Sequence, residues 1–470
     1  MAERASHPVR LVIIGNGMVG HALIDQIRTA NLTDSFQITV FGEEPRVAYD
    51  RVKLSSYFEH GDVEALALTT AKFYHEMRVD LHLGDPVVSI DRQERKVRSR
   101  SGALVHYDQL VLATGSRPFV PPIAGTQSQG CFVYRTIEDL LAIERYASGC
   151  QRAHVIGGGL LGLEAAKALL DKGLETHVVE FAPRLMPMQL DDRGAGALQA
   201  RIEQLGVRVH TDMNATSVLV DPRRRVRGLG FADKSSQGTD MVVFSAGIRP
   251  RDELAKSAGL ALGPRGGIVV DGCCRTSDPR IFAIGECALF EDRCYGLVAP
   301  GYEMARVVVD MLGGTAERRF SVPDMSTKLK LLGVDVGSFG DAFARAPGAR
   351  EFIMEDQLNG TYGKLVVSGD GQRLIGGMLV GDASQYASLV QVMKNDLKLP
   401  MGLESLLVQR EAGESGGGLR PEDLPASAQV CSCNNVSKEQ VVCAIKDDGV
   451  TELGALKKCT GAGTGCGGCG

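Results

Sequence analysis

The sequence predicts an α/β protein with two parallel sheets, followed by smaller domains. Three observations lead to this fold class. An apolar strand runs into a glycine-rich turn and an amphipathic helix at 9–27, the same order returns at 153–170, and paired cysteines lie near the C-terminus. A strand, a turn, a helix and a further strand are the repeating unit of doubly wound parallel sheets. We therefore expect two sheet domains and a cysteine-rich C-terminal domain.

Length and composition are typical of a multidomain globular protein. The 470 residues, 44% hydrophobic and 23% charged, suffice for two to four domains. A formal net charge of −5 without long basic runs argues against nucleic-acid binding. No run of about eighteen apolar residues occurs and residues 1–10 lack a signal sequence, so we expect a cytoplasmic protein without membrane contact. Twelve cysteines then indicate reduced thiols and metal, not disulfides.

The first nucleotide-binding unit is predicted at the N-terminus. Strand 9–14 leads into the turn at 15–20, and a second strand follows at Phe36–Phe41. The turn contributes three glycines, Gly15, Gly17 and Gly20. They allow a tight turn and close approach of a pyrophosphate to the helix N-terminus. Glu43 or Glu44, just past the second strand, can accept hydrogen bonds from the adenosine ribose.

A second unit of the same kind begins at residue 153. Strand, turn and helix occupy 153–170, and the strand at 176–179 ends on Glu180. The turn contributes Gly157, Gly159 and Gly162. An acid at this place binds a ribose 2′-hydroxyl and repels a 2′-phosphate, which favours NADH over NADPH. Arg184, four residues later, weakens this preference without reversing it.

Three further apolar strands end in small-residue turns or on an acid. They lie at 110–115, 241–247 and 281–286. Each alone indicates only a parallel strand, and a single glycine fingerprint is a weak signal. Two fingerprints in strand–turn–helix context, with these strands in order around the second, are a strong one.

That order resembles the two-dinucleotide-fold flavoprotein reductases over about residues 8–315. In that family the first fold binds FAD, the inserted second fold binds NAD(P)H, and an acid after the last strand faces the FAD ribityl chain. The resemblance implies FAD contacts from Thr114, Gly115, Gly285 and Glu286, with Glu286 in place of the family's Asp. It also implies an NADH contact from Gly247.

A branch within this family is indicated by the cysteines and by one motif. The first 130 residues contain no cysteine, so we expect no redox disulfide. Tyr-Asp-Arg-x-x-Leu-Ser at 49–55 resembles NADH-dependent reductases that serve small iron–sulfur proteins, which implies that Arg51 lies against FAD. The family lysine after this motif is replaced by Ser56, and Lys53 is the nearest candidate for a flavin-side role.

Glu164 is the second catalytic candidate. The resemblance implies that it meets the nicotinamide carboxamide. The alternative is an acid near a helix N-terminus, favoured by the helix dipole.

The C-terminal cysteines predict an iron–sulfur cluster. A C-x-C and a C-x-x-C pair supply four sulfur ligands for a [2Fe–2S] cluster: Cys431, Cys433, Cys466 and Cys469. The segment resembles the bacterioferritin-associated ferredoxin type of domain. A zinc site is the alternative, because four cysteines do not choose the metal. Of the two remaining cysteines, Cys443 is expected in the core and Cys459 is a substitute ligand candidate.

Longer stretches at 11–20, 41–46, 294–302 and 328–336 resemble the large subunits of NADH-dependent nitrite reductases. The resemblance implies that electrons pass from NADH through FAD to the [2Fe–2S] cluster. They would then reach sirohaem and a [4Fe–4S] cluster in a missing half or a partner, where nitrite becomes ammonia. The chain ends one residue after its last cysteine, so we expect the N-terminal part of a longer enzyme or dependence on a partner.

Three alternatives remain open from the sequence. The electron-transfer (diaphorase) subunit of assimilatory nitrate reductase shares the layout, with a molybdenum-containing partner. A stand-alone NADH–ferredoxin or rubredoxin reductase would use the tail as its own electron port. A non-enzymatic sensor of iron or redox state is the third.

The predicted domain order follows from these motifs. An FAD-binding domain comprises 1–120 and 246–315, interrupted by an NADH-binding domain at 121–245. A small α+β interface domain that can support a homodimer follows at 316–410. A Gly/Pro/Glu/Ser-rich linker at 411–428 then leads to the [2Fe–2S] domain at 429–470.

Overall fold

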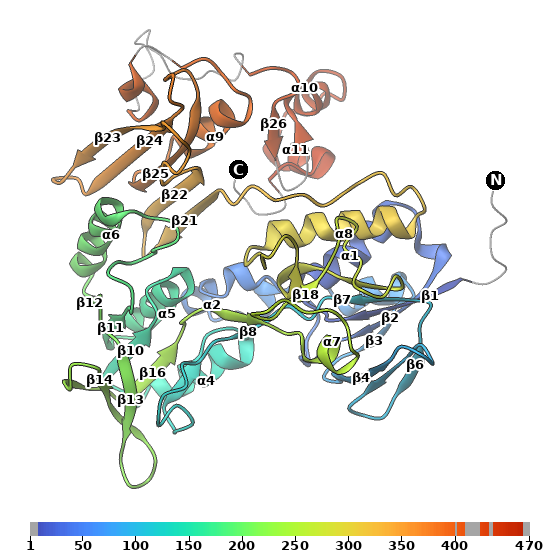
Figure 1. The fold of residues 1–470 in the computed structure, drawn as a ribbon, viewed down its shortest axis with the longest axis horizontal. Helices are drawn as coiled ribbons and strands as arrows, with labels where there is room; N and C mark the ends of the chain where they lie inside the picture. The colour runs from blue at the N-terminus through green and yellow to red at the C-terminus, as the bar shows by residue number, and fades with distance from the viewer. Residues whose placement is uncertain (1–7, 400–401, 409–423, 432–435, 464–470) are drawn as a thin grey trace. The chain divides into compact units, whose positions relative to one another are not determined.

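The computed structural model describes residues 8–399, 402–408, 424–431 and 436–463 (Figure 1). The chain forms two compact units. The first comprises residues up to 119, together with 135–140 and 247–323. The second comprises 120–134, 141–246 and the chain from 324 onward.

The core of the first unit is a five-stranded parallel sheet in the order β19-β7-β1-β2-β3. Its strands are β1 (Val9–Ile14), β2 (Phe36–Phe41), β3 (Asp80–His82), β7 (Gln109–Leu112) and β19 (Ile281–Ala283). The central strands are continuous apolar runs with buried side chains, as expected for a sheet covered on both faces. All five carboxyl ends therefore lie at one edge of the sheet.

Helices and small antiparallel elements complete this unit. The helices are α1 (Met18–Thr29), α2 (Ser56–His60), α3 (Ala71–Glu76), α7 (Glu253–Ser257) and α8 (Val298–Leu312). One small sheet has three strands, β4 (Val87–Asp91), β5 (Lys96–Ser99) and β6 (Leu104–His106). Two further sheets have two strands each: β8 (Ser116–Pro118) pairs with β17 (Ile248–Pro250), and β18 (Ile268–Val269) pairs with β20 (Ala288–Leu289). Helices α1 and α8 lie side by side (Figure 1), and a Cβ on Gly301 would come within 2.6 Å of Val19.

The second unit contains another parallel sheet, in the order β12-β11-β10-β16-β9. Its strands are β9 (Cys131–Val133), β10 (Arg152–Ile156), β11 (Glu175–Val179), β12 (Arg208–His210) and β16 (Met241–Phe244). With it belong α4 (Ile137–Ala147, entered from the first unit), α5 (Leu160–Asp171), α6 (Asp192–Gln204) and the antiparallel strands β13 (Ala215–Val220), β14 (Val226–Phe231) and β15 (Ser236–Gly238).

A five-stranded antiparallel sheet and the C-terminal segment complete the second unit. The sheet runs β21-β22-β25-β24-β23 and packs with α9 (Tyr386–Lys394). Its strands are β21 (Thr327–Leu331), β22 (Val334–Gly340), β23 (Arg350–Asp356), β24 (Thr361–Val367) and β25 (Leu374–Gly381). The C-terminal segment contains β26 (Gln429–Cys431), β27 (Val436–Ser437), α10 (Lys438–Lys446) and α11 (Leu453–Thr460).

The predicted α/β fold class is confirmed: two parallel sheets are followed by a separate antiparallel sheet. Within the part of the chain that the structure describes, no helix has the length and apolar character needed to cross a bilayer. One expectation was wrong: Cys443 is exposed on α10, because the apolar side of this short helix is covered only in part.

Candidate functional site

The first glycine turn, between β1 and α1, has an open side. Gly15 adopts a φ of +117°, and a Cβ there would lie 2.1 Å from the Ala113 carbonyl oxygen, so only glycine fits. Gly20 is equally tight, since its Cβ would lie 2.0 Å from the Gly15 carbonyl oxygen. Gly17, by contrast, would place a Cβ in open space, and it caps α1 without a side-chain hydrogen bond. The backbone N–H groups at this helix start are thus available to an anion.

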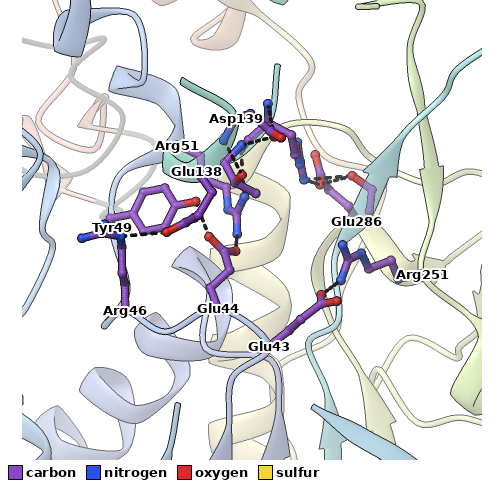
Figure 2. Close-up of polar contacts among 12 residues, drawn as sticks. Glu43, Glu44, Arg46, Tyr49, Arg51, Glu138, Asp139, Arg251 and Glu286 are labelled. Carbon is purple, nitrogen blue, oxygen red and sulfur yellow. Dashed lines mark hydrogen bonds and ion pairs between the residues drawn. The ribbon is translucent and has the colours of Figure 1, made fainter. Parts of the chain in front are cut away.

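The two predicted ribose acids have different neighbours. The carboxylate of Glu44 pairs with the guanidinium of Arg51 and accepts from the Tyr49 hydroxyl at 2.6 Å (Figure 2). The carboxylate of Glu43 instead pairs with Arg251. Glu44 is therefore held inside a local network, whereas Glu43 stands at the carboxyl edge of the sheet beside an arginine that follows β17.

Arg51 serves this network from the Tyr-Asp-Arg motif. Its second nitrogen donates to the backbone carbonyl of Arg135 at 3.0 Å. Burial opposes its charge, but Tyr49 and Glu44 outweigh burial and raise the pKa of Arg51. Lys53, two residues later, has a side chain that is 70% exposed and pairs with Asp50 at 3.3 Å. The motif arginine is thus largely enclosed, with a side chain that is 23% exposed, whereas Lys53 extends into solvent.

The end of β19 carries the third group of predicted residues. Gly285 adopts a φ of +77°, and the carboxylate of Glu286 accepts from the Ser116 hydroxyl at 2.6 Å and pairs with Arg135. At the end of β7 the Thr114 hydroxyl donates to the carbonyl of Arg251 at 2.6 Å. The residues predicted after β1, β2, β7 and β19 are therefore brought to one edge of one sheet.

The second glycine turn repeats the first in the second unit. Gly157 adopts a φ of +115° with the Ser245 carbonyl oxygen 2.3 Å from an added Cβ, and a Cβ on Gly162 would lie 1.9 Å from the Gly157 carbonyl oxygen. Gly159 caps α5 without a side-chain bond, and its Cβ would meet nothing within 4 Å. This helix start, like that of α1, suits a pyrophosphate. Gly247 belongs to the first unit, where it has a φ of +101° and an added Cβ would meet nothing within 4 Å.

Glu180 is oriented by the backbone. Its carboxylate accepts from the N–H of Gly158 at 2.5 Å and from the N–H of Ala182 at 2.7 Å. Arg184 donates to the Leu190 carbonyl at 3.0 Å and pairs with Asp192 at 2.8 Å. The acid is thus fixed beside the glycine turn, and the arginine that could oppose it is engaged elsewhere.

Glu164 is the fifth residue of α5, so it lies past the uncapped first turn. Its Oε2 atom is buried and has no hydrogen-bond partner among the described residues. Burial raises the pKa of this carboxyl to about 7. A buried carboxyl without a partner is costly, which marks a place where a bound molecule can supply the missing hydrogen bond.

The predicted cluster ligands are only partly described. Cys431 is buried at the end of β26, whereas Cys433, Cys466 and Cys469 lie outside the described residues. Cys459 is exposed on α11. Within the described ranges, no three His, Cys, Asp or Glu residues gather as a metal site.

Sequence reasoning missed two arginines, Arg135 and Arg251. Arg135 precedes a capping pair in which the N–H of Thr136 donates to the Asp139 carboxylate at 2.8 Å and the N–H of Asp139 donates to the Thr136 hydroxyl at 3.2 Å. A Thr-x-x-Asp pattern ahead of an apolar helix was a usable signal for this start. Arg251 gave no such signal, because its role depends on a strand far away in the sequence.

Comparison with known proteins covers nearly the whole chain. Residues 9–310 match the family model described as pyridine nucleotide-disulphide oxidoreductase. Residues 326–397 match the rubredoxin NAD+ reductase C-terminal domain, and 429–470 match the BFD-like [2Fe-2S] binding domain.

Individual relatives agree with these matches. The nitrite reductase (NADH) large subunit of Escherichia coli is 50% identical over 98% of this chain and 54% of its own length. An assimilatory nitrate reductase electron transfer subunit from Bacillus subtilis is 33% identical over 98% of this chain and 58% of its own length. The chain thus spans about half the length of the curated relatives it matches. A crystal structure of a ferredoxin reductase from Rhodopseudomonas palustris superposes with a TM-score of 0.74, at 28% identity, over 83% of this chain and 95% of that one.

Proposed function

The chain belongs to the pyridine nucleotide-disulphide oxidoreductase family, and from this premise we propose that it is the electron-input part of an NADH-dependent nitrite reductase. In this proposal it takes electrons from NADH onto FAD and passes them to a [2Fe–2S] cluster in the C-terminal domain. They leave for a sirohaem centre in a further domain or partner, where nitrite becomes ammonia. A homodimer through the small antiparallel domain is part of the same proposal.

One observation carries the proposal: two parallel sheets each present an uncapped helix start beside a glycine that leaves open space. These are α1 at Gly17 and α5 at Gly159. An uncapped helix start has unsatisfied N–H groups and a positive dipole end, and a dinucleotide pyrophosphate satisfies both. Two such sites on one chain are what a transfer between two dinucleotides requires.

The first sheet would hold FAD. The glycine turn would take the pyrophosphate, Glu43 or Glu44 the ribose, and Thr114, Gly115, Gly285 and Glu286 the rest of the molecule, with Arg51 beside it. When bound, FAD accepts a hydride and releases its electrons one at a time. The chain contributes position, not proton transfer, because hydride transfer depends chiefly on alignment.

The second sheet would hold NADH. The backbone fixes Glu180 beside the turn, where it would accept from the ribose hydroxyls and repel a 2′-phosphate. The engagement of Arg184 with Asp192 supports this preference for NADH. The unpartnered carboxyl of Glu164 would bind the nicotinamide carboxamide and orient the ring. Residues 121–245 would form this domain, and 1–120 with 246–315 the FAD domain.

The cluster would be held by Cys431, Cys433, Cys466 and Cys469 in a [2Fe–2S] domain at 429–470. Iron is favoured over zinc because the segment matches a [2Fe-2S] binding domain and adjoins a flavoprotein fold. When bound, the cluster carries single electrons.

The test is an anaerobic titration of the purified chain with NADH, followed by visible and low-temperature EPR spectra. Bleaching of the flavin together with the EPR signal of a reduced [2Fe–2S] centre is the expected result. The Cys431→Ser variant should bleach without that EPR signal. A wild-type chain that bleaches but gives no cluster signal would contradict the relay and leave a flavin diaphorase.

The second candidate is the electron-transfer part of a nitrate-reducing system. The Bacillus subtilis relative of that name supports it, with lower identity than the nitrite reductase. The two candidates differ in the acceptor. NADH-driven reduction of a separately purified sirohaem protein, compared with a molybdenum-containing one, distinguishes them.

A further inference from the structure

Arg251 is anchored at one strand of the first sheet and forms an ion pair at another. Its N–H donates to the Gly115 carbonyl at 2.9 Å, and its own carbonyl accepts from the Thr114 hydroxyl at 2.6 Å. Both partners follow β7. Its guanidinium pairs with the carboxylate of Glu43, which follows β2 (Figure 2). The side chain therefore reaches from the end of β7 toward the end of β2.

The sheet order shows what lies under this side chain. Strand β1 stands between β7 and β2, and all three are parallel. The carboxyl end of β1 continues into the glycine turn and the uncapped start of α1. The Arg251–Glu43 pair therefore bridges the two strands on either side of the proposed pyrophosphate position.

The charges explain why the pair forms and why it can open. Burial lowers the pKa of Arg251, so its charge lies in a place where an anion is favourable. Glu43 is 48% exposed at its side chain and supplies that anion. A free guanidinium at this edge would bind a pyrophosphate through two hydrogen bonds. The same arginine can thus serve either partner.

We propose that Arg251 is a cofactor clamp, whose guanidinium turns from Glu43 to the pyrophosphate of FAD when FAD binds at the first glycine turn. The inference rests on the proposed FAD site. It adds a residue to that site and assigns it a change of partner. Glu43 is released in the same step and becomes available to the adenosine ribose.

The test compares Arg251→Met with Arg249→Met. Arg249 is two residues earlier on β17 and lies over the ring of Phe119 at 4.1 Å, which makes it a matched control on the same segment. FAD affinity of the deflavinated protein is measured by quenching of flavin fluorescence. We expect R251M to bind FAD on the order of tenfold to a hundredfold more weakly, the value of one charged hydrogen-bonding contact. R249M should bind like the wild type.

A double-mutant cycle tests the change of partner. Thermal midpoints of wild type, E43Q, R251M and the double variant give the coupling between the two side chains, without and with FAD. We expect measurable coupling in the cofactor-free protein and its loss when FAD is bound.

Four results would overturn the clamp. One is equal FAD affinity of R251M and R249M, and another is coupling that FAD leaves unchanged. If R251M fails to fold, as judged by circular dichroism, R251K replaces it; wild-type affinity in R251K, which keeps the charge without the planar fork, would also contradict a bidentate contact. Wild-type protein that takes up no FAD would overturn the proposed function together with the clamp.

Discussion

Replacing Glu164 by Gln should remove a pH dependence from both stability and NADH use. Burial raises the pKa of this carboxyl from 4.5 to about 7, and its Oε2 atom has no partner. The folded protein thus holds the proton more tightly than the unfolded chain does. The stability of the wild type should therefore fall as pH rises from 4.5 to about 7, and the full cost should be present above pH 7.

The size of this effect follows from the two pKa values. The interval between 4.5 and about 7, at about 1.36 kcal/mol per pH unit, gives about 3 kcal/mol as an upper value. Gln has nearly the same shape and no charge. E164Q should therefore be about as stable as the wild type at pH 4.5 and up to about 3 kcal/mol more stable at pH 8.

Urea unfolding of both proteins at several pH values measures this difference. Glu203→Gln, at an exposed position on α6, is the matched control and should keep the wild-type profile. The rate of flavin reduction by NADH should also change near pH 7 in the wild type and stay level in E164Q, because an amide can still bond a carboxamide. Parallel stability curves for wild type and E164Q would refute the reasoning.

Three further variants test other parts of the structure. Glu180→Gln should lower kcat/KM for NADH about tenfold and reduce the ratio of kcat/KM for NADH to that for NADPH. The reason is that the variant loses the carboxylate charge of Glu180, which the Gly158 N–H orients. Steady-state rates with both nucleotides measure the effect. Lys364→Met should cost about 3 kcal/mol in urea unfolding, because Lys364 is buried and its ammonium bonds Asp191 at 2.9 Å and Glu351 at 2.8 Å. Its loss leaves both carboxylates without this cation, while Asp191 keeps its hydrogen bonds from Tyr362 and Gly194. An unchanged midpoint would contradict this prediction. Burial lowers the pKa of His154 from 6.5 to about 4, so the folded protein keeps this imidazole neutral. The stability is therefore full above pH 6.5, and about 3 kcal/mol of it is lost as the pH falls toward 4. His154→Gln should lose less stability over that pH range in the same urea assay.

The sequence predicted the fold class because the local signals agreed with the global topology. Both glycine turns combine a tight glycine that contacts a neighbouring strand with an open one at the helix start, and the spacing alone indicates this. Contacts between distant segments were beyond reach. The pairing of Glu286 with Arg135 and of Glu43 with Arg251 joins residues 151 and 208 positions apart, and no periodicity marks such partners. Arg51 was predicted from its motif, but its pairing with Glu44, and the arginines beside Glu43 and Glu286, came only from the structure.

Those cations distinguish the two proposed nucleotide sites. In the first sheet each acid after β2 has an arginine beside it, Arg251 for Glu43 and Arg51 for Glu44. In the second sheet Glu180 is held by two backbone N–H groups, and among the described residues it forms no ion pair. Two arginines beside the proposed FAD site offset the negative charge of a dinucleotide, whether they pair with the acids or with the pyrophosphate, and this suits a resident cofactor. A site with an uncompensated acid rejects an extra phosphate and binds more weakly, which suits a substrate that must leave after each turnover. In our proposal the same turn therefore serves FAD in one sheet and NADH in the other, and the residues around the acids set the difference.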